Sequence, residues 1–581
     1  VVHLMIKTII DIETDGLEPT RIWFAACKDI DSDFVRVCFN SDELKKTIAK
    51  TDVFVGHNLL GFDLHWLKEL WDIDIDYRKV EDTLVLSTLF YPERLGGHSL
   101  EQWGITLKNE KGKHTDWLKM SSDMISYCIQ DVKLTDQVYK HLLNSEKDDF
   151  SDRSIKLEHT IKYVISQQER KGFYLNEKKS HILLSEIKSK SNEILLQVRQ
   201  EIKPSVNLVR DVIPKYNKDG ALSVTGLKSI VNPIQTVGGP FSLISFEPFN
   251  LGSPKQIIKR MERFGWKPID FTEKGQPQIT QRNLESVVST APSSIRNLAV
   301  WKMLETRAKT IEGWLDALTP DGRVHGKVFT MGAVTGRMTH AKPNLANIVS
   351  ASKPYGADLR GCWTVENVNT HCLVGMDAKG LELRMLAHYM QDDNFIEEVI
   401  DGDPHTYNQN AAGLETRAQA KTFIYALLYG AGAAKIGSII NGSSVQGKNI
   451  QEKFLRNVPK LGKLITAVQG KAGRGYIRGI DGRRIWIRQV RASLNTLLQG
   501  SGAIVCKQWS ILLHDEIQRR NLDAHLVNTI HDEQQYEVRK EHAEELMKIA
   551  DTTMLDTGKF FDMRLPLNAD ATMGTTWAET H

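Results

Sequence analysis

Short apolar runs alternate with amphipathic segments over the first 145 residues. Residues 6–13 (Ile-Lys-Thr-Ile-Ile-Asp-Ile-Glu) are mostly apolar and predict a buried strand. Strand and helix signals alternate from there to about residue 145, as is typical of an α/β domain. The polar stretch at 144–152 then predicts a linker.

The periodicity becomes helical beyond this linker. One apolar stripe covers 161–165, with Gly172 as the expected helix end, and a second stripe covers 184–198. Residues 201–252 lose this periodicity and gather Pro, Gly, Asn and Ser, which predicts a long loop. Ser253-Pro254 then opens a basic helix, and mixed α/β patterning runs from about residue 320.

Composition narrows the class of protein. The 581 residues are 41% hydrophobic and 25% charged, which is typical of a soluble globular chain of roughly three or four domains. The net charge of +3 does not demand a nucleic-acid partner, so any basic surface must be local. Six cysteines without a C-x-x-C pair argue against a zinc module and favour a reducing compartment. The sequence contains no apolar run of the roughly 18 residues that a membrane span requires.

Four carboxylates and a phenol recur in the amino-terminal region. Asp11 and Glu13 are two apart on the predicted strand, so both face the same way. Asp63 follows, and Tyr127 precedes Asp131 by one helical turn. Such a set suits two-metal phosphodiester hydrolysis. We interpret Asp82 as structural, and His57 and His65 as supporting polar groups.

This ordered set resembles the Tyr-type 3′–5′ proofreading exonucleases of the DEDD superfamily. The resemblance implies a ribonuclease H-like exonuclease domain at about 1–147. It makes Asp11, Glu13 and Tyr127 catalytic, and it makes Asp11, Glu13, Asp63 and Asp131 the metal ligands.

A second acidic set lies in the carboxy-terminal half. Val374–Asp377 predicts a strand that ends in an acid, and Gly380–His388 predicts a helix. Residues 525–530 and 534–538 predict a hairpin with His531-Asp532-Glu533 at its tip. A tight tip would place Asp532 against Asp377, where two carboxylates can hold two Mg²⁺ ions.

Between these acids, residues 417–429 carry a stripe at spacing four: Arg417, Lys421, Tyr425 and Tyr429. Residues four apart share one helix face. The two cations suit a triphosphate, and the two rings suit a base to stack on.

These motifs together resemble family A DNA polymerases, the group of bacterial DNA polymerase one, and most nearly the replicative polymerases of short-tailed phages. Residues 377–384 resemble motif A, 417–430 resemble motif B, and His531-Asp532-Glu533 resembles motif C. The resemblance runs over nearly the whole chain. It implies a multidomain α/β plus α+β fold in which the exonuclease domain precedes a right-hand polymerase at 148–581. The thumb is expected at about 148–318, the palm at about 319–398 and 479–581, and the fingers at about 399–478.

The resemblance also implies roles for individual residues. Asp377, Ala378 and Asp532 would hold Mg²⁺, two ions per active site with Mn²⁺ as a substitute, and Glu533 would join Asp377 and Asp532 as catalytic. Arg417, Lys421 and His405 would contact the triphosphate of the incoming nucleotide. Tyr425 would face the sugar 3′ carbon, and Tyr429 would hydrogen-bond Glu382. Glu382 would then exclude the 2′-hydroxyl of ribonucleotides. The DNA contacts would be Arg337, Gln499, Asn495, Arg491 and His531.

The resemblance implies a template-directed polymerase that proofreads and replicates phage-type DNA in the cytoplasm of an infected bacterial host. Primer–template DNA and deoxynucleoside triphosphates are the expected partners, joined by a phage helicase–primase and a single-stranded DNA-binding protein. Thioredoxin binding is disfavoured, because the 201–252 segment is short and lacks a dense Lys/Arg cluster. The basic stretch from Arg474 to Arg491 is a candidate for phosphate contacts. Lys379 departs from motif A, in which small or uncharged polar residues are more familiar at this position. We expect it either to contact a primer phosphate or to be an exposed residue.

Three other function classes compete with this interpretation. A single-subunit RNA polymerase shares the palm chemistry, but Glu382 and the exonuclease set argue against it. A non-catalytic DNA-binding or processivity subunit should lack carboxylates that this chain has. A helicase or primase is disfavoured because no G-x-x-x-x-G-K-[ST] loop occurs.

Overall fold

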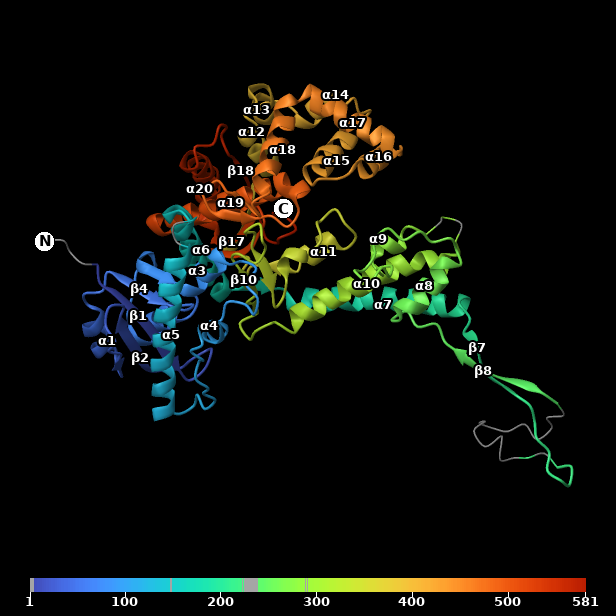
Figure 1. The fold of residues 1–581 in the computed structure, drawn as a ribbon, viewed down its shortest axis with the longest axis horizontal. Coiled ribbons are helices and arrows are strands. Elements are labelled where there is room, and N and C mark those ends of the chain that lie inside the picture. The colour runs from blue at the N-terminus through green and yellow to red at the C-terminus, as the bar shows by residue number, and fades with distance from the viewer. Residues whose placement is uncertain (1–4, 147–148, 222, 224–238, 288, 290) are drawn as a thin grey trace. The chain divides into compact units, whose positions relative to one another are not determined.

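The computed structural model describes residues 5–146, 149–221, 223, 239–287, 289 and 291–581. The chain divides into two compact units, each described by itself below (Figure 1). The first combines Val1–Asn176 with Ala317–His581, and the second is Glu177–Asp316. The sequence-predicted boundary near residue 147 therefore lies inside the first unit, and the predicted thumb, at about 148–318, contains the whole second unit.

A five-stranded mixed sheet begins the first unit, in the order β3-β2-β1-β4-β5. Its central strand, β1, pairs antiparallel with β2 and parallel with β4. The strands are β1 (Lys7–Thr14), β2 (Ile22–Asp29), β3 (Arg36–Cys38), β4 (Val53–Gly56) and β5 (Val80–Asp82). The strand predicted at 6–13 is β1, as expected.

Helices cover both faces of this sheet, so its strands are apolar on both sides. Ile9 contributes to the core beneath α3, α4 and α5, whereas Ile10 and Ile12 contribute to the core beneath α1 and α2. The helices are α1 (Ser41–Ile48), α2 (Asp63–Trp71), α3 (Thr83–Phe90), α4 (Leu100–Leu107) and α5 (Ser122–Glu146), with a 3₁₀ turn at Tyr77–Lys79. Asp11 and Glu13 point to the α5 face, because they lie opposite Ala26 and Phe24 in β2.

The polar stretch predicted as a linker separates α5 from α6 (Asp152–Lys171). Two of its residues, 147 and 148, lie outside the described part. The stripe of Ile161, Val164 and Ile165 is buried in a core shared with the carboxy-terminal part of the chain, which explains its spacing. Gly172 ends α6 at φ +65°, and a side chain there would meet His325, so glycine is required on both counts.

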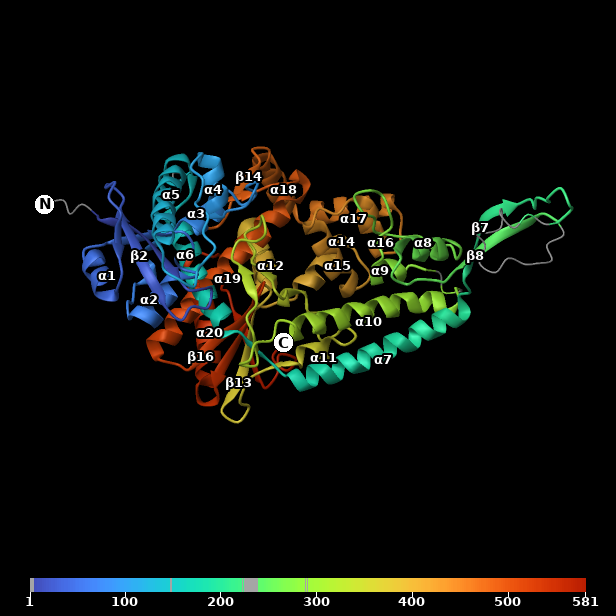
Figure 2. The ribbon, with the colours of Figure 1, turned by 90° about the horizontal axis from the view of Figure 1, so that it is seen from below.

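The second unit is mainly helical. Helices α7 (Glu177–Glu201) and α10 (Ser293–Leu315) lie side by side in both views (Figures 1 and 2), joined by α8 (Pro254–Glu262) and α9 (Gln281–Leu284). The α8 helix starts as predicted, capped by Ser253, which accepts from the Gln256 backbone N–H.

The prediction of a long loop at 201–252 is partly wrong. Strands β7 (Ser205–Val212) and β8 (Phe241–Glu247) pair antiparallel there, although residues 224–238 of the predicted loop lie outside the described part. The register shifts between Leu208 and Arg210, and the strands are largely exposed. Their side chains therefore lack the apolar alternation that identifies a half-buried strand.

A four-stranded antiparallel sheet, in the order β16-β17-β13-β18, carries the carboxy-terminal part of the first unit. Its strands are β13 (His371–Ala378), β16 (Ala524–Ile530), β17 (Glu533–Arg539) and β18 (Ala569–Gly574). The long helix α19 (Ser493–Arg520) and α20 (Lys540–Phe560) contact each other, and α20 covers β13. Smaller sheets join β12 (Trp363–Thr364), β6 (Phe173–Leu175) and β9 (Arg323–Val324), then β10 (Lys327–Phe329) with β11 (Thr339–Ala341), and β14 (Tyr476–Arg478) with β15 (Arg484–Trp486).

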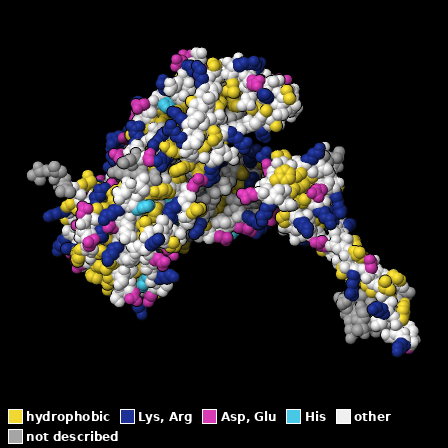
Figure 3. All heavy atoms as spheres, viewed as in Figure 1, with side chains coloured by type: hydrophobic (Ala, Val, Ile, Leu, Met, Phe, Trp, Pro, Cys, Tyr) yellow, Lys and Arg dark blue, Asp and Glu magenta, His cyan; other side chains and the backbone are white. Residues whose placement is uncertain are grey.

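A group of helices lies between β13 and β14 in the sequence: α12 (Leu381–Met390), α13 (Asp393–Ile400), α14 (Pro404–Ala412), α15 (Arg417–Leu428), α16 (Ala433–Ile439), α17 (Ser444–Asn457) and α18 (Pro459–Ala472). The short α11 (Gly356–Arg360) precedes β12. One core joins these helices to the four-stranded sheet, with Phe423, Phe454 and Trp509 fully buried in it. On the face shown in Figure 3, Lys and Arg side chains are interspersed with Asp and Glu, in keeping with the net charge of +3. Among the described helices, none combines the length and apolar character of a membrane span.

Candidate active sites

The first site forms where β13 meets the β16–β17 hairpin. A two-residue turn, His531-Asp532, joins the strands, because Ile530 pairs directly with Glu533. His531 sits at φ +55°, a left-handed conformation that non-glycine residues adopt at a cost and that often marks functional turns. Asp377 pairs with Glu533, and the Ala378 N–H donates to the Asp532 carbonyl at 3.0 Å. The sheet register therefore brings Asp377 and Asp532 together, as the motifs predicted.

The electrostatics of this edge favour a cation. Lost hydration, then repulsion from Asp532 and Glu533, raises the pKa of Asp377 to about 7. Burial also raises the pKa of Asp532. Carboxylates that repel each other in this way are the oxygen ligands a divalent metal ion would neutralise. Asp570 of β18, opposite Asp377, adds to the repulsion and was not anticipated from the sequence.

Glu533 differs from these two acids because protein donors already engage it. The indole of Trp577 donates to one oxygen, and the Gln535 amide donates to the same oxygen at 2.8 Å. His581 contacts the other oxygen at 2.8 Å, with Arg360 3.7 Å away. These contacts lower the pKa of Glu533 despite its burial. Glu533 thus anchors the chain's last residues behind the turn.

The predicted cation–aromatic stripe lies on α15 and its C-cap. Thr416 begins the helix through a capping box with Gln419, and Tyr429 is the C-cap residue. Lys421 is exposed, whereas Tyr425 is half-buried, with its ring centre 6.2 Å from that of His405. His405 is buried, and its Nδ1 atom has no protein partner.

Arg417 contacts a protein carboxylate in this structure. Its Nε donates to Asp403 Oδ2 at 2.6 Å and its Nη2 donates to Asp403 Oδ1 at 3.1 Å. Asp403 also caps α14 through the His405 backbone N–H. This exposed pair holds the start of α15 beside α14 and leaves Arg417 with spare donors.

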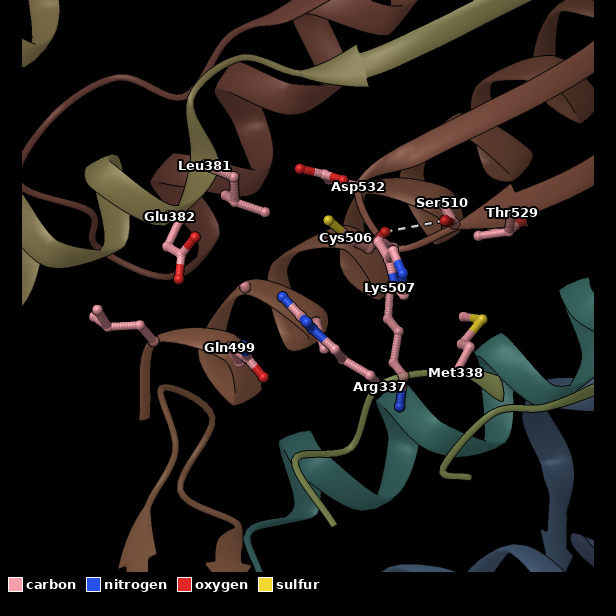
Figure 4. Close-up of a pocket in the computed structure, with 14 residues that line it drawn as sticks. Arg337, Met338, Leu381, Glu382, Gln499, Cys506, Lys507, Ser510, Thr529 and Asp532 are labelled. Carbon is pink, nitrogen blue, oxygen red and sulfur yellow. Dashed lines mark hydrogen bonds between the residues drawn. The ribbon is translucent and has the colours of Figure 1, made fainter. Parts of the chain in front are cut away.

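Tyr429, Glu382 and Gln499 are linked by side-chain hydrogen bonds, so the contact predicted between Tyr429 and Glu382 is present. Burial raises the pKa of Glu382, and its Oε1 atom is buried without a partner. Both Glu382 and Gln499 line a cavity of about 80 Å³ (Figure 4). Arg337 reaches into the cavity from the segment before β11, and Asp532 lies on another side (Figure 4). His531 also lines the cavity.

The other predicted DNA contacts lie near this cavity or on its helix. Asn495 is one turn before Gln499 on α19 and has a buried oxygen without a partner, while Arg491 is exposed just before that helix. Lys379 is exposed and lies 3.7 Å from Asp570. Lys507 and Cys506 also line the cavity, but the sequence contained no signal for them because buried helix positions are usually structural.

The prediction that the stretch from Arg474 to Arg491 contacts phosphates is wrong for one of its arginines. Arg483 is 2% exposed and pairs with Glu158 and with Asp481. Arg478 and Arg484 both contact Asp149, and Arg488 contacts Glu93. The exposed members of the stretch are Arg474, Arg478, Arg488 and Arg491.

The second site lies on β1 of the five-stranded sheet. Ligand atoms of Asp11, Glu13 and Cys128 lie within 4.8 Å of one another. Asp63, at the start of α2, accepts from the Ile12 backbone N–H at 3.2 Å, which holds it against the same strand. Asp131 is 4% exposed, and its Oδ1 atom is buried without a partner. The predicted carboxylates are therefore gathered, and Cys128, one residue after Tyr127, joins them without having been predicted.

The pKa values of all four acids are raised. Burial, then the charge of Asp131, raises the pKa of Asp11 to about 7. Burial, then the charge of Asp11, raises the pKa of Glu13 to about 9. The pKa values of Asp63 and Asp131 are also raised, mainly by burial. A buried acidic cluster with one orphaned oxygen fits oxygen-preferring divalent cations.

Four residues around this cluster have different contacts. Asp82 is fully buried and accepts from the backbone N–H groups of Asn58, Leu60 and Leu84, so it is structural, as predicted. His57 contacts the Thr83 hydroxyl at 2.8 Å, whereas the ring of His65 lies against Trp66. Lys111 lies 2.7 Å from Asp131; it was missed because it sits on a loop without periodicity.

Comparison with known proteins decides the family. The model of DNA polymerase family A matches residues 236–579. The chain is also 30% identical, over 93% of its length and 94% of the relative, to the DNA-directed DNA polymerases of Enterobacteria phage T3 and Escherichia phage T7. The chain belongs to DNA polymerase family A. This family A chain is also 27% identical to DNA polymerase I of Aquifex aeolicus over 56% of its own length and 58% of that protein.

The fold agrees with this membership. The polymerase domain of Pol1 from M. smegmatis, solved with DNA primer–template and dNTP, matches with a TM-score of 0.77 at 19% identity. The match covers 100% of the family A chain and 96% of the solved one. The mixed α/β polymerase fold expected from the motifs is therefore present.

Proposed function

We propose that this protein is a DNA-directed DNA polymerase that replicates phage-type DNA and proofreads with its own 3′–5′ exonuclease. The observation that carries the polymerase assignment is the pairing of β13 with β17. It sets Asp377 beside Asp532, next to the cavity that Glu382 and Gln499 line. Family membership and the phage relatives support the same assignment.

The acidic edges of both sites fit divalent metal ions, since each gathers carboxylates whose pKa values are raised. Asp377, Asp532 and the Ala378 carbonyl would hold Mg²⁺ in one site, and Asp11, Glu13, Asp63 and Asp131 in the other. When bound, Mg²⁺ supplies charge neutralisation and acidifies the attacking hydroxyl or water. Glu533, already engaged by four protein groups, would act by steadying the turn that carries Asp532.

Substrate binding would use the donors that face the site. Lys421, with the spare donors of Arg417, would contact the triphosphate, and His405 would contribute from α14. Phosphoryl transfer depends mainly on such positioning and charge balance. Arg337 and Gln499 would donate to minor-groove acceptors, which every correct base pair offers.

Discrimination between deoxyribonucleotides and ribonucleotides would rest on Glu382. Tyr429, itself hydrogen-bonded to Gln499, holds its carboxylate, and the Oε1 atom of Glu382 is buried without a partner. A 2′-hydroxyl placed against it would displace a held, partly desolvated acid, which is costly. This favours deoxyribonucleotides, and so a DNA polymerase over a single-subunit RNA polymerase.

The exonuclease assignment rests on the gathered carboxylates of β1, α2 and α5, with Tyr127 one turn before Asp131. The sheet order 3-2-1-4-5, with β2 antiparallel, supports a ribonuclease H-like fold. Water would attack the terminal phosphodiester, and Tyr127 would orient that water.

Primer–template DNA and deoxynucleoside triphosphates are the proposed ligands, in line with the DNA and dNTP held by the solved relative. We propose a phage helicase–primase and a single-stranded DNA-binding protein as replication partners, and a phage-infected bacterial host as the setting. The described hairpin β7–β8 has no dense basic cluster, so thioredoxin is not among the proposed partners.

The experiment is primer extension with each dNTP and each rNTP, with and without Mg²⁺. We expect template-directed, Mg²⁺-dependent addition of dNTPs, with rNTPs strongly disfavoured. Asp377→Asn should abolish extension, whereas Asp556→Asn, an exposed acid on α20, should not. Retained extension by Asp377→Asn, or equal use of dNTPs and rNTPs, would overturn the proposal.

A further inference from the structure

Lys111 is a cation inside the acidic cluster of the proposed exonuclease. It lies on the loop between α4 and α5, and its side chain is only 25% exposed. The ammonium is 2.7 Å from Asp131 Oδ2 and 4.9 Å from the centre of the Tyr127 ring. It also hydrogen-bonds the Tyr127 side chain. One lysine thus touches both residues of the Tyr-x-x-x-Asp pair.

The loop that carries Lys111 is fixed against α5. The Gln130 amide donates to Asn109 Oδ1 at 2.6 Å and to the Glu110 carbonyl at 3.3 Å. A side chain at Gly112 would come within 3.2 Å of the Tyr127 ring, so the backbone passes closely over it. Further along the loop, Trp117 meets the same ring edge-on, 5.7 Å between centres. Lys111 is therefore held in place by contacts on both sides.

The donor chemistry of lysine decides the direction of the Tyr127 hydroxyl. An ammonium group has three donors and no acceptor. In the contact with Lys111, the phenol oxygen must therefore accept, and its own O–H donates to the Asp131 carboxylate. A phenol that accepts from a cation is also a stronger donor, because hydrogen bonds in series polarise one another.

We propose that Lys111 is a positioning residue of the exonuclease: it braces Asp131 directly and also holds the Tyr127 phenol, which in turn donates to Asp131. The inference rests on the proposed exonuclease function. In that hydrolysis a bond forms between the water oxygen and phosphorus, and the bond from phosphorus to the 3′ oxygen of the preceding nucleotide breaks. That oxygen leaves as a hydroxyl after gaining a proton, and a nucleoside 5′-monophosphate is released.

A double-mutant cycle tests whether Lys111 acts through Tyr127. Lys111→Met and Tyr127→Phe should each slow degradation of a single-stranded oligonucleotide by about 10- to 100-fold, the cost of one charged hydrogen bond. Together they should be no slower than the worse single variant, because they remove one shared interaction. Lys111→Arg should restore part of the rate. Lys113→Met, on the same loop but exposed, should degrade DNA like the wild type.

Two measurements separate this role from others. Primer extension should be unchanged in every variant, which shows that the fold is intact. Binding of Mn²⁺, followed by calorimetry, should be similar in the wild type and Lys111→Met. Tighter Mn²⁺ binding with an unchanged rate would make Lys111 a mere counter-ion of Asp131, and multiplicative slowing in the double variant would exclude action through Tyr127. A wild type without exonuclease activity would instead overturn the proposed exonuclease, and the role of Lys111 with it.

Discussion

Glu382 is the side chain for which we propose a role in sugar selection. Its carboxylate is tied to Tyr429, and Tyr429 is in turn tied to Gln499, so it has little freedom to retreat from a bulkier sugar. We predict that Glu382→Ala raises ribonucleotide incorporation relative to deoxyribonucleotide by at least about 10-fold. Tyr429→Phe should shift the ratio in the same direction by less, since it removes only the restraint. The measurement is the ratio of incorporation efficiencies for ATP and dATP.

The matched control for this prediction is Glu415→Ala. Glu415 is an exposed acid just before α15, in the same group of helices. It should leave the sugar preference as in the wild type. An unchanged ratio in Glu382→Ala would remove Glu382 from sugar selection.

His57 makes stability depend on pH. Burial lowers its pKa from 6.5 to about 4, and it contacts the Thr83 hydroxyl, which itself donates to the Gly56 carbonyl. Below pH 6.5 the unfolded chain binds a proton at His57 that the folded chain refuses. The folded state therefore loses stability as pH falls from 6.5 toward 4, and the contribution is constant above that window.

We predict that His57→Asn reduces this loss of stability. Its amide can replace the Nδ1 donor to Thr83 but does not titrate. Between pH 7 and pH 5 the wild type should lose on the order of 1 kcal/mol more unfolding free energy than the variant. Urea unfolding at the two pH values gives the difference, and parallel losses in both proteins would contradict the assignment.

At the scale of elements, a buried ionic cluster joins three segments that are distant in sequence. Arg483, beside β15, contacts Glu158 of α6 and Asp481, and Lys507 of α19 contacts the same glutamate at 2.6 Å. Removing one member of such a cluster leaves its partners charged and buried. Arg483→Met should therefore destabilise the protein by about 3–5 kcal/mol.

The control for this cluster is Arg474→Met, at an exposed member of the same basic stretch. It should change stability by less than about 0.5 kcal/mol. It should instead weaken primer–template binding and reduce the salt dependence of that binding. Urea midpoints and DNA titrations at two salt concentrations test both variants. A harmless Arg483→Met would show that the cluster does not hold these elements together.

Elements with a strong period were predictable from the sequence, and the others were not. The apolar run of β1 and the stripe of α6 follow directly from burial, and Gly172 ended its helix as expected. The β7–β8 hairpin was missed because its strands bury little and so lack alternation. Acids at motif spacings led to both candidate sites. Lys111 and Asp570 could not be found, because only the folded chain brings them to the acids.

At the scale of the whole molecule, the sheet of the proposed exonuclease and the sheet of the proposed polymerase site belong to one compact unit. Tyr77 and Arg78 both contact Asp515 of α19, the ring of Tyr77 stacks on Tyr163 of α6 at 4.0 Å, and Arg488 contacts Glu93. These contacts join the amino-terminal region to the rest of the unit, but none of them involves a residue of either acidic set. Each acidic set lies on its own sheet. The two sites should therefore be energetically independent even though the regions are packed together.

We predict that the two activities separate. Asp11→Ala with Glu13→Ala should abolish degradation of a primer 3′ end and leave primer extension unchanged, because it removes carboxylates from β1 alone. Asp532→Ala should abolish extension and leave degradation of single-stranded DNA intact. Both variants should show the same far-ultraviolet circular dichroism as the wild type. Since removing buried like charges relieves repulsion at β1, the double variant should fold at least as well as the parent. A double variant that is folded but cannot extend primers would show that the two acidic sets serve one site.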